Sequence, residues 1–441
     1  MAATTAPTRL QRLADATPPD RDRTVDLLRG LSLVAVALGH WSIAVVRPAA
    51  DGSLTAGSAL TDVAALHPVT WLFQVMPLFF LVGGVANLRS WTSASSRGDG
   101  YATWLAGRLR RLVVPTAVAV AIWCLLATLL TTGGAVSPEL AVLAARTVTL
   151  PLWFLAVYVL VVALAPAMLR LHRRYGLAVP VVLSLAVVAV DVAHRAGVPT
   201  IGWANFALVW LTPQQLGFAW ADERLGRRRV ATALAVGGTA ALLTLTVLGP
   251  YPVSVVGVPG ATASNNSPPT VVLLALTAAQ LGVVLLARPR LETLLRRPGV
   301  WAGVVLLNLR AQTVYLWHLP AMVVVAGTLV RTGATPDAVP GTAAWWLTRP
   351  IWLVQLGLAL AVLMPLVGRL EAAALRRRTP HRVDRRRAVV AVAGSAVGFA
   401  LLATAGVPVP GGGGAGTALA GLGALAVGVA ALTGRRVSPA R

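Results

Sequence analysis

The stretch of sequence that decides the fold class is LVVPTAVAVAIWCLLATLLTT, residues 112–132, which carries no charged side chain. About 20 apolar residues in a helix are enough to cross the hydrocarbon core of a bilayer. Backbone polar groups in lipid must be satisfied within their own segment, so this stretch is predicted to be a transmembrane helix. Similar stretches recur along the chain, in which 56% of the 441 residues are hydrophobic and only 12% are charged. Soluble domains carry about 25% charged residues, so few segments of this chain can face water.

Outward from this helix, twelve apolar segments predict an all-α, polytopic transmembrane helix bundle. The predicted spans are 27–46, 69–88, 112–132, 152–169, 177–193, 201–221, 230–249, 270–287, 303–330, 345–367, 388–406 and 416–434. Ten of them would form the main bundle, and the last two, which are rich in Gly and Ala, would form an appended hairpin. A transmembrane barrel is excluded because its strands would show short alternating segments.

The spans divide the chain into five expected parts. Residues 1–26 are polar and are expected to be a disordered cytoplasmic tail, without the features of a signal peptide. The membrane domain would cover 27–367, followed by a basic cytoplasmic linker at 368–387 with eight arginines. The hairpin would cover 388–434, and 435–441 would be a second cytoplasmic tail. We find no internal repeat of the kind from which many transporters are built.

The arginines predict the orientation in the membrane. All 38 basic residues are arginine, and the net charge is +23. With the N-terminus inside, 32 arginines fall in inner segments; the five outer ones are Arg47, Arg146, Arg195, Arg331 and Arg349. Cytoplasmic loops carry an excess of Lys and Arg, so we expect a multi-pass cell-membrane protein with both termini cytoplasmic. Because the arginines lie between apolar spans, the charge does not indicate a nucleic-acid partner.

Two further segments limit the possible chemistry. The only cysteine, Cys124, excludes an intrachain disulfide and a cysteine-based metal site. The predicted outer loop 250–269 holds five prolines and no charged residue. Two interpretations of this loop stay open, a plain ordered loop and a segment that folds back over a cavity.

His40 is one of two histidines inside the predicted spans. Ionisable side chains at such depth are costly and by default indicate function, although a neutral imidazole bonded between helices is the structural alternative. Arg29 precedes His40 by eleven residues, which is three helical turns plus about 20° and a rise of about 16 Å, so both lie on one face. Asp26 is one turn before Arg29 and can pair with it.

His318 is the second histidine inside a predicted span. It lies in Tyr315-Leu316-Trp317-His318-Leu319-Pro320, where the proline is expected to kink the helix. Arg310 lies two turns earlier, with Asn308 and Gln312 beside it. A helix with so many polar residues is expected to line a cavity instead of facing lipid.

A third cluster, Arg108-Leu109-Arg110-Arg111, stands before the span that starts at residue 112. Arginines three residues apart share a helix face and can hold phosphate groups. Taken by itself, this cluster is better explained by the alternative, in which the arginines only mark the cytoplasmic end of the helix.

Five short motifs occur in order between about residues 20 and 367. They are Asp26-Leu27-Leu28-Arg29-Gly30 leading to Gly39-His40, Met76-Pro77-Leu78-Phe79-Phe80-Leu81-Val82-Gly83-Gly84, Arg108-x-x-Arg111 with Leu112 and Pro115, Trp153-Phe154-Leu155 leading to Tyr158, and Tyr315-Leu316-Trp317-His318-Leu319-Pro320. Together they resemble the acyltransferase-3 family of integral membrane O-acyltransferases. The chain departs from the usual ten helices of that family by the hairpin 388–434.

The resemblance implies an enzyme that moves an acyl group, usually acetyl, from acyl-coenzyme A to a hydroxyl. The acceptor would be a carbohydrate-containing cell-envelope polymer, a glycolipid or a secondary metabolite. The bilayer is the other expected partner, and acyl-coenzyme A would act as a substrate, with no resident cofactor and no metal. Oligomeric state, acyl chain length and the identity of the acceptor are not predicted.

The resemblance also implies roles for particular residues. His40 would be the essential histidine, Arg29 its motif partner, and Arg108 and Arg111 the donor-binding pair. We add His318 to the catalytic set. The residues expected to line or orient the cavity are Asp26, Asn308, Arg310, Tyr315 and Trp153. A histidine can act as general base on the acceptor hydroxyl, or His40 can itself be acylated, and the sequence leaves both open.

Two functions from other classes compete with this prediction. A secondary transporter would share the helix count and the intramembrane polar residues, but it would show paired broken helices in two halves, which we do not find. A membrane assembly subunit without chemistry would leave His40, His318 and Arg310 unexplained.

Overall fold

The computed structural model describes residues 14, 17–18, 21–48, 54–336, 338–376 and 383–433. Most of the predicted tail 1–26, residues 377–382 of the predicted linker, and the predicted tail 435–441 lie outside the described residues.

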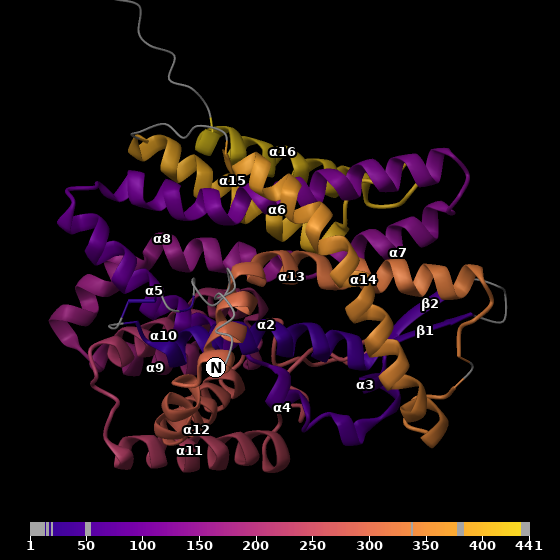
Figure 1. The fold of residues 1–441 in the computed structure, drawn as a ribbon. Helices are drawn as coiled ribbons and strands as arrows, with labels where there is room; N and C mark the ends of the chain where they lie inside the picture. Colours follow the sequence, from indigo (N-terminus) through magenta and orange to yellow (C-terminus); the bar gives the residue numbers. More distant parts are fainter. Residues whose placement is uncertain are drawn as a thin grey trace, which may run out of the picture. The chain divides into compact units, whose positions relative to one another are not determined.

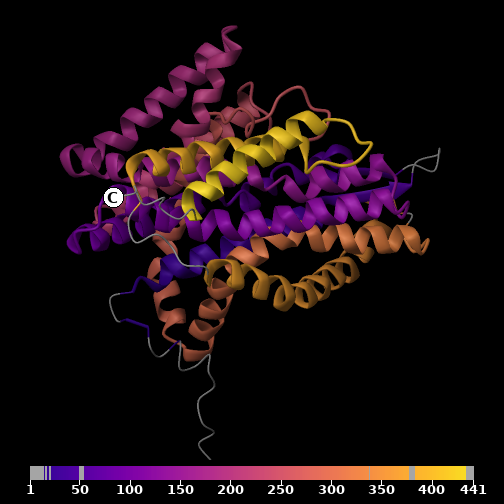
Figure 2. The same cartoon turned by 90° about the horizontal axis from the view of Figure 1, so that it is seen from above.

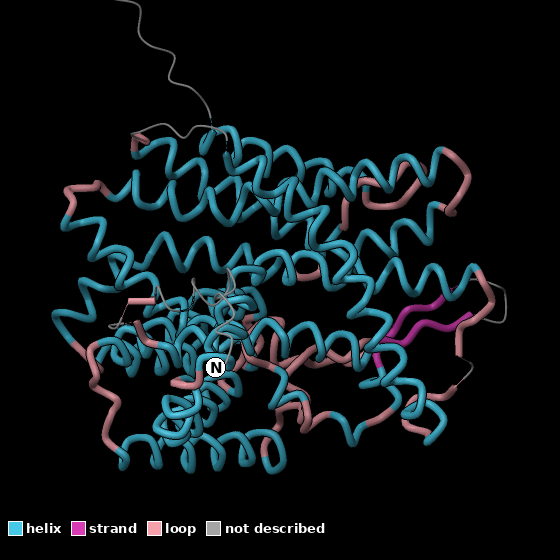
Figure 3. Tube along the Cα trace, in the orientation of Figure 1, coloured by secondary structure: helices cyan, strands magenta, loops and turns pink. Residues whose placement is uncertain are grey.

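The regular secondary structure of the described residues is helical apart from one two-stranded sheet (Figures 1 and 3). Its elements are α2 (Arg23–Ile43), β1 (Ala44–Pro48), β2 (Leu54–Ser58), α3 (Ala59–Asp62), η1 (Ala64–Leu66), α4 (Thr70–Phe73), α5 (Met76–Ser96), α6 (Tyr101–Thr132), α7 (Pro138–Thr149), α8 (Leu152–Tyr175), α9 (Ala178–Arg195), η2 (Pro199–Ala204), α10 (Asn205–Ala221), α11 (Arg228–Leu243), η3 (Thr244–Leu248), α12 (Val272–Leu295), α13 (Pro298–Arg331), α14 (Ala343–Arg376), α15 (Arg385–Ala405) and α16 (Ala415–Thr433). The predicted all-α class is therefore confirmed.

Each of the twelve predicted spans overlaps one of the long helices. Within the described residues, ten segments are long and apolar enough to cross a membrane. The two long helices not among these ten are α2 and α10. Helix α2 carries the charged residues Arg23, Asp26 and Arg29 in its first two turns, and α10 is only 17 residues long, which is short of the about 20 residues that a span usually needs. The polytopic helix bundle is confirmed.

Three local predictions differ from the structure. Helix α6 begins at Tyr101, so the arginines at 108–111 lie well inside the helix and not at its start. Helix α2 ends at Ile43, because the β-branched Val45 and Val46 pair with β2 in an antiparallel hairpin (magenta in Figure 3). Helix α7 was not predicted; it starts where the Ser137 side chain accepts a hydrogen bond from the Leu140 N–H, with proline in the first turn.

The chain divides into two compact units, which are described separately. Unit 1 comprises residues 1–39, 65–88 and 169–312, and unit 2 comprises 40–64, 89–168 and 313–441. The division falls within α2, α5, α8 and α13, each of which contributes residues to both units.

Unit 1 is built around the first turns of α2 packed against α5, α10, α11 and α12. Its apolar core contains Val25, Leu28, Leu81, Val82, Val85, Ala219, Trp220, Leu225, Ala231, Leu281 and Leu285. A second cluster places Leu27 of α2 against Leu295 and against Trp301 of α13. The N-terminal half of α2 is thus held from two sides by apolar contacts.

Two glycines set the distance between α5 and α10 in unit 1. A Cβ added at Gly84 would lie 2.3 Å from the Gln214 carbonyl oxygen, and one at Gly217 would lie 2.1 Å from the Leu81 carbonyl oxygen. Only a residue without a side chain permits backbones to approach this closely. Gly84 of the Met76–Gly84 motif therefore has a packing role in addition to any role in function.

The loop 250–269 of unit 1 is ordered and packs on the segment around α4. The amide of the buried Asn265 donates to the carbonyls of Pro252 and Ser254 at 2.7 and 2.9 Å. Trp71 donates to the Val253 carbonyl at 2.7 Å, which fixes the loop to α4. Tyr251 donates to Asp191 at 2.9 Å. Burial, and then this carboxylate, raise the pKa of Tyr251 to about 12, so the hydroxyl remains a donor at neutral pH.

In unit 2, α6 contacts α7, α14, α15 and α16. Helices α15 and α16 run side by side along most of their length (yellow in Figures 1 and 2). Small residues allow this, since a Cβ at Gly398 would lie 2.7 Å from the Leu425 backbone nitrogen. The predicted hairpin thus packs on the helix that carries Arg108 and Arg111.

We predict that Gly217→Ala lowers the thermal stability of the detergent-solubilised protein, because the added methyl group meets backbone and cannot be accommodated by a rotamer change. Overpacking of this kind costs about 1–3 kcal/mol. The matched control is Gly327→Ala in α13, where nothing lies within 4 Å of the added Cβ. Equal melting temperatures for the two variants would contradict the close approach of α5 and α10.

Candidate active site

The two histidines predicted from the sequence meet in unit 2. Nδ1 of His40, in the last turn of α2, lies 2.9 Å from Nε2 of His318, in α13. The two imidazole planes are nearly parallel, at 6°, with ring centroids 5.2 Å apart. His318 is 1% exposed, whereas His40 is partly exposed. Of the two residues, His40 is therefore the less buried.

Hydrogen-bond partners define the tautomer of each ring. Nδ1 of His318 lies 2.7 Å from the backbone oxygen of Tyr315. A carbonyl oxygen only accepts, so this Nδ1 carries the proton, and Nε2 of the neutral ring is an acceptor. His40 consequently donates from Nδ1–H to His318. The remaining nitrogen of His40, Nε2, is then unprotonated and carries a lone pair.

The backbone and the tryptophans around His318 hold the pair in place. Trp41 donates from Nε1 to the His318 carbonyl at 2.9 Å, and Trp352 of α14 donates to the Trp41 carbonyl at 2.8 Å. All three residues are buried. This chain of bonds links α2, α13 and α14, so the ring positions do not depend on a single contact.

A buried carboxylate holds the same turn of α13 from the other side. Glu371 of α14, 6% exposed, accepts from Thr313 Oγ1 at 2.8 Å and from Trp317 Nε1 at 3.0 Å. The two donors precede His318 by five residues and by one residue. Both carboxylate oxygens are therefore used to fix the turn that presents His318.

Aromatic contacts connect the fourth and fifth sequence motifs. Tyr315 donates to the Pro151 carbonyl, and its ring meets the Phe154 ring edge-on with centroids 5.6 Å apart. Phe154 in turn contacts Trp153, with centroids 6.3 Å apart. Tyr315 therefore lies beside His318, with ring centroids 6.2 Å apart, and Trp153 is connected to it through Phe154. That these two residues line or orient the cavity stays a prediction.

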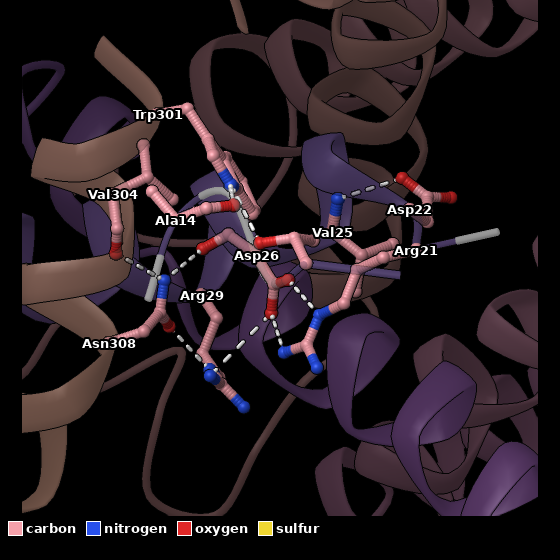
Figure 4. A network of polar contacts seen from close by, with 10 residues as sticks. Ala14, Arg21, Asp22, Val25, Asp26, Arg29, Trp301, Val304 and Asn308 are labelled. Atoms are coloured by element: carbon pink, nitrogen blue, oxygen red, sulfur yellow. Dashed lines mark hydrogen bonds and ion pairs between the residues drawn. The ribbon is translucent and has the colours of Figure 1, made fainter. Parts of the chain in front are cut away.

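Arg29 belongs to a polar network in unit 1 (Figure 4). Its Nε donates to Asn308 Oδ1 at 2.6 Å, and its guanidinium lies 3.6 Å from Asp26 Oδ1. The predicted Asp26–Arg29 pair is confirmed, but Arg21 binds Asp26 more closely, through two bonds of 2.6 and 2.9 Å. The amide of Asn308 donates to the backbone oxygens of Asp26 and Val304. Asn308 therefore joins α2 to α13 and orients Arg29.

The other predicted site residues lie apart from these contacts. Arg310 is exposed and is not part of the network in Figure 4. Arg111 is exposed and donates to the Gly107 carbonyl, and Arg108 is partly exposed one turn earlier on α6. Arg110, between them, donates to the Leu375 carbonyl at 2.6 Å and so serves the packing of α14 on α6. Spacing alone did not separate this structural arginine from the other two.

A family model described as an acyltransferase domain matches residues 22–368. The chain belongs to the acyltransferase-3 family. It is accordingly a membrane acyltransferase, and the match includes the histidine pair, the Arg29 network and α6. The hairpin of α15 and α16 lies beyond it. No curated protein and no solved structure gives a significant match.

In this acyltransferase, sequence reasoning missed Glu371. It falls within the predicted linker 368–387, but α14 continues through it to Arg376. A signal was present, because the buried residues Leu356, Leu360, Val367 and Glu371 recur at helical spacing on one face. An acidic residue on the apolar face of a helix is the pattern that would have indicated a buried carboxylate with partners.

We predict that Glu371→Ala destabilises the protein, because it leaves the buried Trp317 N–H and the Thr313 hydroxyl without their acceptor. An unsatisfied buried donor costs about 1–3 kcal/mol. The measurement is thermal unfolding, with Glu292→Ala as the control. Glu292 forms an exposed pair with Arg288, so its loss should change stability by about 0.5 kcal/mol or less. Equal effects of the two substitutions would show that the contacts of Glu371 contribute little.

Proposed function

We propose that this acyltransferase moves an acyl group, in the first instance acetyl, from acyl-coenzyme A to a hydroxyl of a carbohydrate-containing acceptor. Acceptors of this class are cell-envelope polymers, glycolipids and glycosylated secondary metabolites. The observation that supports the proposal best is the lone pair on Nε2 of His40, held by a buried partner ring that accepts from Nδ1. A hydroxyl needs such a base to attack a thioester.

In the proposed reaction, the acceptor hydroxyl gives its proton to His40 Nε2 while its oxygen bonds to the thioester carbonyl carbon. The carbon–sulfur bond then breaks, and the departing sulfur recovers the proton from Nε2. During the step His40 is an imidazolium whose Nδ1–H still donates to His318 Nε2. This bond stabilises the transient charge, and the Tyr315 carbonyl prevents His318 from turning its own N–H toward His40.

The same geometry suits a covalent relay. Nε2 of His40 would attack the thioester carbon, the carbon–sulfur bond would break, and coenzyme A would leave as its thiolate. The acyl group would then pass from the imidazole to the acceptor oxygen, and the hydroxyl proton would return to the imidazole pair and from there to the thiolate. The Nδ1 proton could move to His318 Nε2 across the 2.9 Å bond, which neutralises the acylated ring. The two routes differ in whether an acyl group can be trapped on the protein without acceptor.

Arg108 and Arg111 are the proposed contacts for the donor. Coenzyme A carries several phosphate charges, and arginines at i and i+3 on one helix can share a phosphate group. Both belong to unit 2, as does the histidine pair. Arg29 is proposed as a further positive group, although Asp26 and Asn308 already engage it in unit 1.

We also propose that both termini are cytoplasmic. The support is the distribution of 32 arginines on one side against five on the other. Under this topology Arg108 and Arg111 face the compartment that contains coenzyme A.

We predict that His40→Ala reduces acetyl transfer about 10²–10⁴-fold per folded molecule if His40 acts as a base. Transfer from acetyl-coenzyme A would be measured in proteoliposomes, with folded protein quantified by monodisperse elution in detergent. His318→Ala should reduce transfer less, because His40 retains its Nε2 lone pair and loses only orientation. The control is His194→Ala, since His194 is a partly exposed histidine of unit 1 outside the pair.

An attempt to trap an acyl group on the protein distinguishes general-base catalysis from the covalent relay. A larger loss in His40→Ala, together with an acyl label on wild-type protein in the absence of acceptor, would favour the relay. Near-normal turnover of His40→Ala would remove the centre of the mechanism. A total loss only in His318→Ala would show that the other histidine is the reacting one.

We predict that the double variant Arg108→Ala, Arg111→Ala raises KM for acetyl-coenzyme A, with a smaller effect on kcat. Charge-assisted hydrogen bonds to phosphate contribute about 1.5–3 kcal/mol each, so KM should rise at least about tenfold. The control removes Arg173 and Arg174, two exposed arginines at the end of α8. Unchanged donor affinity in the folded double variant would refute the assignment of the donor site.

A further inference from the structure

A cavity of about 270 Å³ lies in unit 2, lined by β1, the end of α13 and the first turns of α14. Its volume is just below the range of about 300–1,000 Å³ found for drug-sized ligands, which leaves room for one sugar-sized unit. Its polar and aromatic lining includes Arg47, Trp345, Arg349, Trp352 and Gln355. None of the reaction steps above uses this cavity.

Arg349 is held in the wall of this cavity with part of its hydrogen-bonding capacity unused. Its guanidinium lies 4.4 Å from the ring centroid of Trp345 and 5.7 Å from that of Trp352. It donates to the Ala44 carbonyl and to the Thr348 hydroxyl, through three of its five N–H groups. Stacking on indole rings positions the planar group, and one N–H on each of its two terminal nitrogens remains to donate to an oxyanion.

The described lining of the cavity contains two arginines and no Asp or Glu. One of them, Arg47, pairs with Asp62 at 3.5 Å. For Arg349, no ion pair with a described carboxylate is found. A partly buried guanidinium with N–H donors to spare can bind an anionic ligand through charge-assisted hydrogen bonds.

The cavity is coupled to the histidine pair by hydrogen bonds within unit 2. Trp352, which lines it, donates to the Trp41 carbonyl, and Trp41 donates to the His318 carbonyl. A ligand that packs on Trp352 is therefore two hydrogen bonds from the residue that orients His40. A position so close to the reacting pair suits the molecule that receives the acyl group.

We propose that this cavity binds the anionic group of the acceptor, so that the enzyme acylates a carbohydrate that bears a carboxylate or a phosphate. Arg349 binds the oxyanion, and the indoles of Trp345 and Trp352 contact the sugar ring. The inference rests on the proposed function, because it names the acceptor class for that reaction. A phospholipid headgroup offers the same phosphate chemistry, but lipid would have no need of the contact from Trp352 to the histidine pair.

Binding of small probes to the whole protein tests the proposal. Purified protein in nanodiscs of phosphatidylcholine would be titrated with methyl β-glucuronide, glucose 6-phosphate and the neutral methyl β-glucoside, using saturation-transfer difference NMR. We expect at least one anionic probe to bind about tenfold or more tightly than the glucoside, as one charge-assisted contact implies. Arg349→Gln should abolish this preference, and Arg349→Lys, which keeps the charge without the paired donors, should retain part of it.

The control is Arg331→Gln, an arginine at the end of α13 that does not line the cavity; it should keep the full preference. Equal binding of charged and neutral probes to wild type, or a preference that survives in Arg349→Gln, would overturn the proposal. So would loss of the preference when phosphatidylglycerol is added to the wild-type nanodiscs, which would identify a lipid-headgroup site. Hydrolysis of acetyl-coenzyme A by the same wild-type preparation tests the proposed function separately, so failure of one is distinguishable from failure of the other.

Discussion

In the proposed mechanism, a single hydrogen bond between two imidazoles, from His40 Nδ1 to His318 Nε2, determines which ring nitrogen can react. Because the Tyr315 carbonyl holds the proton on His318 Nδ1, the direction of the bond is set, and the free lone pair is on His40. Two neutral rings that bond each other are also less costly among apolar helices than two unpartnered or charged histidines. The bond therefore serves both stability and reactivity, and the residues around it are arranged to preserve its direction.

The helices that carry this bond are each held by polar contacts in otherwise apolar surroundings. In unit 2, the Glu371 carboxylate fixes the turn of α13 before His318, and Trp41 and Trp352 fix the turn that contains it. In unit 1, Asn308 of α13 bonds Arg29 and the backbone of α2. The same two helices, α2 and α13, thus supply both the histidine pair and the Arg29 network. Membrane proteins lack a hydrophobic force between helices, so such hydrogen bonds and close small-residue contacts select the helix partners.

The fold was largely predictable, because apolar segments of about 20 residues have one stable solution in lipid. The sequence also singled out His40, His318 and the Asp26–Arg29 pair, since ionisable residues stand out against apolar spans. It did not predict α7 or the strands β1 and β2, which lie between spans where hydropathy carries no signal. It could not show that His40 and His318 bond each other across 278 residues, or that Arg110 packs on α14 while Arg108 and Arg111 remain more open. Those facts depend on helix partners, which no local pattern encodes. Arg310 stood out equally and is exposed, so intramembrane charge alone does not identify a site residue.

The tautomers of the two histidines are the most direct test of His40 as the reacting group. Nitrogen-15 NMR of histidine-labelled protein, with His40→Gln and His318→Gln to assign the signals, reports which ring nitrogens carry protons at neutral pH. The hydrogen-bond geometry requires a protonated Nδ1 and an unprotonated Nε2 on both rings. A proton on Nε2 of His40 would leave no lone pair for a hydroxyl or a thioester and would contradict its assignment as base or nucleophile.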